Sequence, residues 1–260
     1  NRDWYLAVHV ESQNRLKFYH QWLPNVVTDH HEMGTNSTFF FEPSKENAEN
    51  PLVPQYVYKT LNTKFAKYYE KALNGIGSLY YTKESFDNLY PGYGSSYPDI
   101  QGGLGLLFEQ ASSRGFIQDS QHGPVTFAFT IRNQLVCALA TCQAALDERQ
   151  NLLKFQREFF ASAISEANKS AIKGYIVGDA GDASKLRKFA QTLFHHRIES
   201  YQLTDNLTID GKMFEKGKAL IVPTAQPQYR MVQSMFEKPT KFADSLFYDA
   251  SAWNMPLSFG

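Results

Sequence analysis

Cysteine, net charge and long apolar runs are all scarce in this sequence of 260 residues. Its two cysteines, Cys137 and Cys142, fall on different faces of a predicted helix, so we expect no disulfide between them. The 26 Lys and Arg equal the 26 Asp and Glu, and no segment holds a basic block, which argues against nucleic-acid binding. No stretch is long and apolar enough to predict a membrane span.

The residues that are abundant predict a folded chain. Hydrophobic residues make up 43% and aromatic residues 15% of the sequence, which is enough for a buried core. No signal-like segment opens the chain, and its first residue is Asn1 rather than Met. We therefore expect an N-terminal part, with any export signal, to precede this sequence.

Residues 1–165 form the first predicted domain, which is rich in Tyr, Phe and Gly. Its apolar spacing predicts a short strand at 25–29, a helix at 54–74, a buried strand at 104–108 and a long helix at 132–160.

Residues 170–260 form the second predicted domain, in which short strands alternate with helices. The predicted order is a strand at 171–177, a helix at 183–194, strands at 198–203 and 219–223, and a helix at 226–236. The dipeptide Asp210-Gly211 favours a tight hairpin between two of these strands. The alternation predicts an α/β fold with a small parallel sheet of flavodoxin-like size.

The segment from Asp29 to Gly34, DHHEMG, follows the first apolar strand. A histidine where a strand passes into a loop is a frequent metal ligand, because its second ring nitrogen can bond an orienting partner. The alternative is a polar loop histidine with ordinary hydrogen bonds. The segment is not an HExxH helix, since no second histidine follows at the required spacing.

Glu109 stands at the end of the buried strand that follows a loop rich in Gly, Ser and Tyr. A carboxylate in an apolar strand is costly unless it has a partner, and a metal or a metal-bound water is one such partner. A salt bridge or a capped backbone group is the alternative. The pair Asn1-Arg2, taken alone, is ordinary surface polarity.

In their order and type these features resemble the zinc carboxypeptidase family of the carboxypeptidase A type. The strings NRDW, DHHEMG, YTKESFDNLYPGYG and FEQAS are similar to a bacterial subgroup of it, and the resemblance covers about residues 1–160. It implies that residues 1–165 are the C-terminal part of a mixed-sheet catalytic domain. Residues 170–260 resemble the glutamine-amidotransferase-like domains attached to some bacterial members. They contain no cysteine nucleophile, so we expect no glutaminase activity.

The resemblance implies a role for each candidate residue of the first domain. His31 matches the family's last zinc ligand, and Glu109 matches the general base that takes a proton from zinc-bound water. Asn1 and Arg2 match the clamp for the C-terminal carboxylate of a peptide substrate. Tyr90 matches the loop tyrosine that closes over the substrate. Its neighbour Tyr93 lies in the same loop and is a rival for that role.

The implied activity is zinc-dependent removal of C-terminal residues from peptides that have a free carboxylate, in the periplasm or outside the cell. The alternatives are a non-catalytic binding protein of the same fold and a zinc deacylase of N-acyl amino acids. The family's other two zinc ligands come from a His-x-x-Glu motif that we expect before Asn1. The one such motif in the chain, His196 to Glu199, lies in the second domain, and we interpret it as coincidence.

Overall fold

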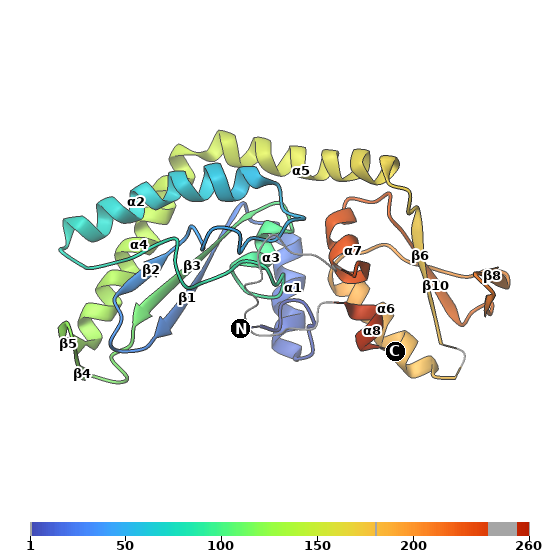
Figure 1. Cartoon of the computed structure of the whole chain (residues 1–260), viewed down its shortest axis with the longest axis horizontal. Coiled ribbons are helices and arrows are strands. Elements are labelled where there is room, and N and C mark those ends of the chain that lie inside the picture. Colours follow the sequence, from blue (N-terminus) through green and yellow to red (C-terminus); the bar gives the residue numbers. More distant parts are fainter. Residues whose placement is uncertain (1, 180, 239–253, 260) are drawn as a thin grey trace. The chain divides into compact units, whose positions relative to one another are not determined.

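The computed structural model describes residues 2–179, 181–238 and 254–259, so Asn1 lies outside the described residues. The chain is a mixture of helices and small sheets, as predicted at that level (Figure 1). In chain order the elements are α1 (Val10–Trp22), β1 (Val26–Met33), β2 (Phe39–Phe41), the π-helix η1 (Val57–Leu61), α2 (Asn62–Gly75), α3 (Ser96–Asp99), β3 (Leu104–Ala111), β4 (Ile117–Ser120), β5 (Gly123–Thr126), α4 (Phe127–Asp147), α5 (Arg149–Lys169), β6 (Gly174–Gly178), α6 (Ala183–His195), β7 (Tyr201–Gln202), β8 (Leu207–Ile209), β9 (Lys212–Phe214), β10 (Ala219–Pro223), α7 (Tyr229–Phe236) and α8 (Met255–Ser258).

The chain divides into two compact units. Among the described residues, the first unit contains Arg2 and Pro24–Gln156, and the second contains Asp3–Leu23, 157–238 and 254–259. The segment Asp3–Leu23, which the sequence-based division placed with residues 1–165, therefore clusters with the second unit. Its helix α1 buries Leu16 and Tyr19 and contacts α6.

A three-stranded sheet of order β1-β3-β2 is the centre of the first unit. Strand β1 runs parallel to β3, with a register from Val26 opposite Leu104 to Met33 opposite Ala111, and β2 runs antiparallel to β3. Every residue of β3 is buried, as the unbroken apolar run predicts for a central strand. In Figure 1 helices α2 and α4 lie beside this sheet, and Tyr69 of α2 packs edge-on against Phe108 with ring centroids 4.9 Å apart.

The segment before β3 covers the other face of the sheet at very close range. A Cβ atom on Gly105 would lie 1.4 Å from the carbonyl oxygen of Ser95, so only glycine fits there. The backbone N–H of Gly105 donates to Oδ1 of Asp99 over 2.8 Å, which fixes α3 to the strand.

The long helix predicted at 132–160 is wrong as a single element, because the chain forms α4 and α5 with Glu148 between them. Glu148 leaves helical geometry at φ −93° and ψ 8°. Its carboxylate accepts from Lys64 Nζ on α2 over 2.7 Å. This contact between segments distant in sequence holds Glu148 at the break, and the helical pattern cannot reveal it.

The apolar side chains of α4 form a stripe that stays in contact with solvent. Four residues at four-residue spacing make up this α4 stripe, each between 49% and 61% exposed: Phe127, Ile131, Leu135 and Leu139. A cavity of about 480 Å³ separates part of the stripe from His30 and Glu32 of β1. The helix itself starts from a regular cap, in which Thr126 Oγ1 accepts from the N–H of Phe129.

The second unit contains a sheet of order β6-β10-β7 in which β10 is antiparallel to both neighbours. The predicted flavodoxin-like parallel sheet is therefore wrong. The connection from β7 to β10 contains the hairpin β8–β9, turning at Asp210 and Gly211, and no helix. A parallel pair needs a long crossover, usually a helix, so a connection of this kind returns the chain antiparallel.

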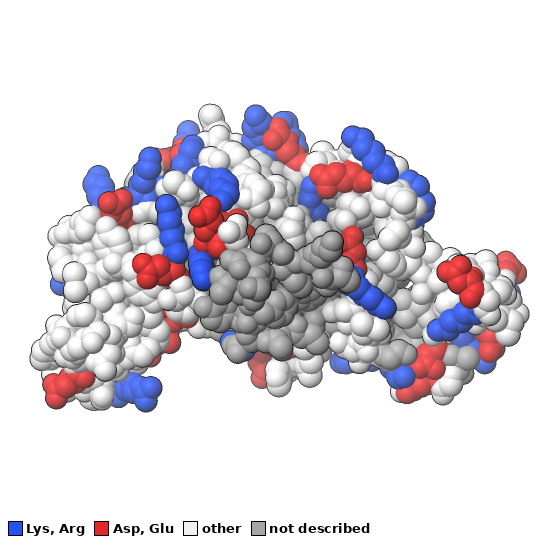
Figure 2. All heavy atoms as spheres, viewed as in Figure 1, with Lys and Arg blue, Asp and Glu red and all other residues white. Residues whose placement is uncertain are grey.

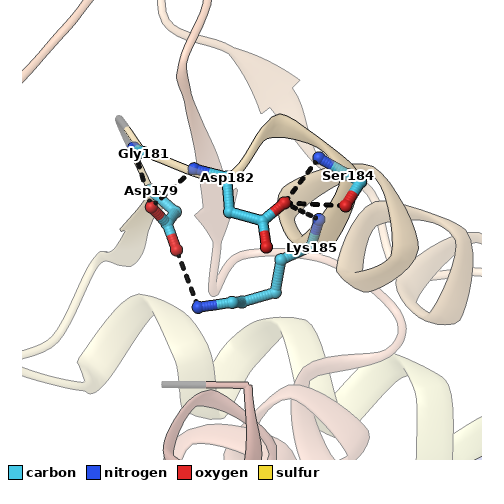
Figure 3. A network of polar contacts seen from close by, with 5 residues as sticks. All are labelled: Asp179, Gly181, Asp182, Ser184 and Lys185. Atoms are coloured by element: carbon cyan, nitrogen blue, oxygen red, sulfur yellow. Dashed lines mark hydrogen bonds and ion pairs between the residues drawn. The ribbon is translucent and has the colours of Figure 1, made fainter.

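Helix α6 of this unit is fixed by the polar network shown in Figure 3. Asp182 caps the helix, because its Oδ1 accepts from the backbone N–H groups of Ser184 and Lys185, each over 3.0 Å. Asp179 Oδ1 accepts from the N–H of Gly181 over 2.9 Å, and its Oδ2 lies 2.9 Å from Lys185 Nζ. These bonds pair the polar groups of the turn with one another and with the start of α6, so we interpret the network as stabilising the fold.

Acidic and basic side chains are interspersed on the face of the molecule shown in Figure 2. Within the described ranges, no helix combines the length and the apolarity needed to cross a lipid bilayer.

Candidate functional site

The parallel pairing of β1 and β3 places His31 directly beside Glu109 in the register. Neighbouring residues of a parallel pair point to the same face, so both side chains project on the face covered by the segment before β3. His31 was expected in a loop after the strand, and it lies within β1 instead. His30 points to the opposite face, where its Nδ1 lies 2.6 Å from Gln134 Oε1 of α4.

Asp29 stands on the same face of β1 as His31, since they are two residues apart in a strand. Its Oδ1 lies 3.0 Å from His31 Nε2. The hydrogen bond from His31 to Asp29 raises the pKa of the imidazole above its ordinary value, and partial burial opposes this. The charge on Asp29 and then that on Glu109 add to the rise. A carboxylate can only accept a hydrogen bond, so Nε2 carries a proton.

Glu109 is a buried carboxylate on this face, and its charged form is destabilised by burial. It is only 8% exposed, and burial raises its pKa from 4.5 to about 7, while nearby His31 lowers it in part. Its Oε2 is buried without a hydrogen-bond partner among the described residues. A buried carboxylate oxygen of this kind is costly and is typical of a group that acts on a ligand.

Residues 90–95, here named the tyrosine loop, cover the face that holds Asp29, His31 and Glu109. A Cβ atom on Gly94 would lie 2.3 Å from Asp29 Oδ2, so the loop backbone rests on that carboxylate. Tyr90 is 3% exposed and packs against Gly92, where an added Cβ would lie 2.3 Å from its ring.

Tyr93 is more open than Tyr90 and stands edge-on to it, with ring centroids 5.3 Å apart. The exposed Arg2 places its guanidinium over the Tyr93 ring, 5.7 Å from the centroid. The first unit therefore brings Arg2 to the tyrosine loop, where it contacts Tyr93.

Among the side chains of this face, His31 has the surroundings of a zinc ligand. An imidazole oriented by a carboxylate through one ring nitrogen is the usual arrangement of a zinc-binding histidine, and the orphaned Oε2 of Glu109 stands on the same face. Across residues 2–179, 181–238 and 254–259, no three His, Cys, Asp or Glu side chains are grouped to hold a metal. Zinc at His31 would therefore need ligands from outside these residues.

The His-x-x-Glu motif of the second unit does not form a site. His196 is fully buried, its Nε2 lies 2.7 Å from the carbonyl oxygen of Tyr5, and burial lowers its pKa to about 3. Glu199, by contrast, is exposed. Both cysteines are free thiols; Cys137 is buried and Cys142 is exposed.

No family model, no curated protein and no solved structure matches this chain. Its function must therefore be argued from the site itself.

Sequence reasoning did not find the role of Asp29 or of Gly94. The signal was present, because Asp29 precedes His31 by two residues and so shares its face in any strand. The alternation separates His31 from His30, but it does not by itself reveal the contact between Asp29 and His31.

Proposed function

We propose that this chain carries one side of a zinc-dependent carboxypeptidase site, which hydrolyses the C-terminal residue of peptides. The observation that carries the proposal is the pairing of His31 with Glu109 on adjacent parallel strands, with Glu109 buried and its pKa raised to about 7. The resemblance of the sequence to zinc carboxypeptidases adds to this observation and gives the substrate class.

Each residue has a role that its surroundings support. His31 would hold the metal, and zinc when bound supplies a water whose pKa falls to about 7. Glu109, with a pKa in the same range, accepts a proton at its unpartnered Oε2 and later returns it to the leaving amine. Arg2 binds the terminal carboxylate of the peptide, because its planar fork matches both oxygens. Tyr93 and Tyr90 help to exclude water when the loop closes over the peptide.

The test uses the protein expressed from its whole reading frame and loaded with zinc. Peptides with a free C-terminal carboxylate should be hydrolysed, and the same peptides with an amidated C-terminus should not. Glu109→Gln should lower kcat by roughly 10²–10⁴-fold while zinc stays bound. Glu32→Gln is the matched control, because this substitution removes the same charge from the residue next to His31, on the opposite face of β1. The Glu32→Gln variant should keep its hydrolytic activity.

Three outcomes would contradict the proposal or one of its assigned roles. Zinc binding without hydrolysis of any peptide would favour a non-catalytic binding protein. Hydrolysis confined to N-acyl amino acids would favour a deacylase. Retained hydrolysis in Glu109→Gln would remove the assigned role of that carboxylate.

A further inference from the structure

Asp29 contacts two parts of the site that are far apart in the sequence. On one side its Oδ1 accepts from His31 Nε2 over 3.0 Å. On the other side Gly94 of the tyrosine loop packs so closely that a Cβ would lie 2.3 Å from Oδ2 and 2.6 Å from Cγ. The Asp29 side chain is short and its Cγ is directly behind these oxygens, so it cannot yield to a larger residue without turning away from His31.

We propose that Asp29 is a positioning residue, which fixes the ring orientation of His31 and is itself held in place by the tyrosine loop at Gly94. With Nε2 directed to the carboxylate, the lone pair of the neutral ring is on Nδ1, the nitrogen through which His31 would bind zinc. This inference deepens the proposed function and rests on it for the identity of the metal. The contact between Asp29, His31 and Gly94 is independent of that function.

The consequence is a mechanical link between the loop that covers a substrate and the ligand that holds a metal. A displacement of the loop at Gly94 releases the carboxylate, and a released carboxylate no longer fixes the imidazole. The glycine at position 94 is thus required by the contact with Asp29 and not by a left-handed backbone, since its φ is not positive.

The first test needs neither zinc nor substrate. A hydrogen bond to a carboxylate protects the Nε2–H proton of His31 from exchange with water, so this proton should give a downfield NMR signal correlated with its ring nitrogen. The protein has seven histidines, and the spectrum of His31→Gln identifies which signal belongs to His31.

The variants separate the two halves of the proposal. The signal should persist in wild type, weaken in Asp29→Asn, which keeps an acceptor oxygen, and vanish in Asp29→Ala. It should also vanish in Gly94→Ala. Gly34→Ala is the matched control, because the same change just after β1 meets no other atom within 4 Å, and the signal should remain.

An unchanged signal in Asp29→Ala would overturn the positioning role, and an unchanged signal in Gly94→Ala would overturn the link to the loop. If Asp29→Ala does not fold, Asp29→Asn and Gly94→Ala decide the question. In the zinc-loaded protein, Asp29→Ala should weaken zinc affinity by roughly 10–100-fold, with His31→Gln as the baseline. A protein that shows the predicted signals but hydrolyses no peptide would refute the proposed function and leave this inference standing.

Discussion

Glu42 offers a test of buried electrostatics in the core of the first unit. It is fully buried, its Oε2 accepts from Ser44 Oγ over 2.7 Å, and its Oε1 accepts from Asn88 Nδ2 over 3.0 Å. Burial nevertheless raises its pKa from 4.5 to about 7, because these two hydrogen bonds offset only part of the lost hydration. We therefore expect Glu42→Gln to change how stability depends on pH.

The sign follows from the direction of the shift. The folded state binds the Glu42 proton more tightly than the unfolded state, so its charged form weakens the fold. Stability is lost as the pH rises from 4.5 towards 7 and stays lower above it. At 1.36 kcal/mol per pKa unit, a shift of this size corresponds to about 3 kcal/mol. Part of this loss occurs below pH 5, so wild type should lose about 2.5 kcal/mol more stability than Glu42→Gln between pH 5 and pH 8.

The assay must report on the first unit. Trp4 and Trp22, the tryptophans of the described residues, both belong to the second unit, so tryptophan fluorescence is unsuitable. Hydrogen exchange of a peptide that covers β3, measured by mass spectrometry at several pH values, gives the free energy of opening of the first unit's core. Glu70→Gln, on the exposed side of α2, is the control and should follow wild type. If the free energy of opening differed between Glu42→Gln and wild type by the same amount at pH 5 and at pH 8, the reasoning would be refuted.

Three further predictions concern packing and capping. Gly105→Ala should abolish soluble folding of the first unit, because its Cβ would overlap the carbonyl oxygen of Ser95; a soluble variant with unchanged exchange of β3 would contradict this. Asp182→Ala should lower the unfolding free energy of the second unit by about 1 kcal/mol, as loss of a helix cap does, in urea titrations followed by tryptophan fluorescence. Arg230→Met should lower the unfolding free energy of the second unit by about 2 kcal/mol in the same titration, because Arg230 is 4% exposed and its removal breaks its hydrogen bonds to the carbonyl oxygen of Phe159 and to Ser162 Oγ.

The sequence predicts best the elements that local pattern alone determines. The buried strand at 104–108 corresponds to β3, since a short apolar run that follows two glycines is typical of a buried strand. The helix at 183–194 corresponds to α6, which starts at the capping residue Asp182.

Elements set by distant contacts could not be predicted in the same way. Nothing local marks Glu148 as a helix break, because its conformation depends on Lys64 of another helix. The antiparallel direction of β10, by contrast, could have been predicted from the sequence. Residues 203–218 contain a hairpin signal and no helical pattern, so they offer no helical crossover to a parallel strand.

The candidate site shows the same division. Glu109 and His31 could be selected from their residue types and neighbours, but only the register of two parallel strands shows that they stand side by side. The contact of Gly94 with Asp29 joins positions 65 residues apart, and one sequence contains no signal for it.

The α4 stripe affects how the folded protein behaves in common assays. Environment-sensitive dyes that report unfolding become fluorescent when they meet apolar surface, and four large side chains about half exposed along one helix present such a surface before any heating. Thermal-shift curves recorded with such dyes would start from a high signal, with a small or inverted transition. Calorimetry or circular dichroism avoids this interference, because neither method requires a probe that binds the stripe.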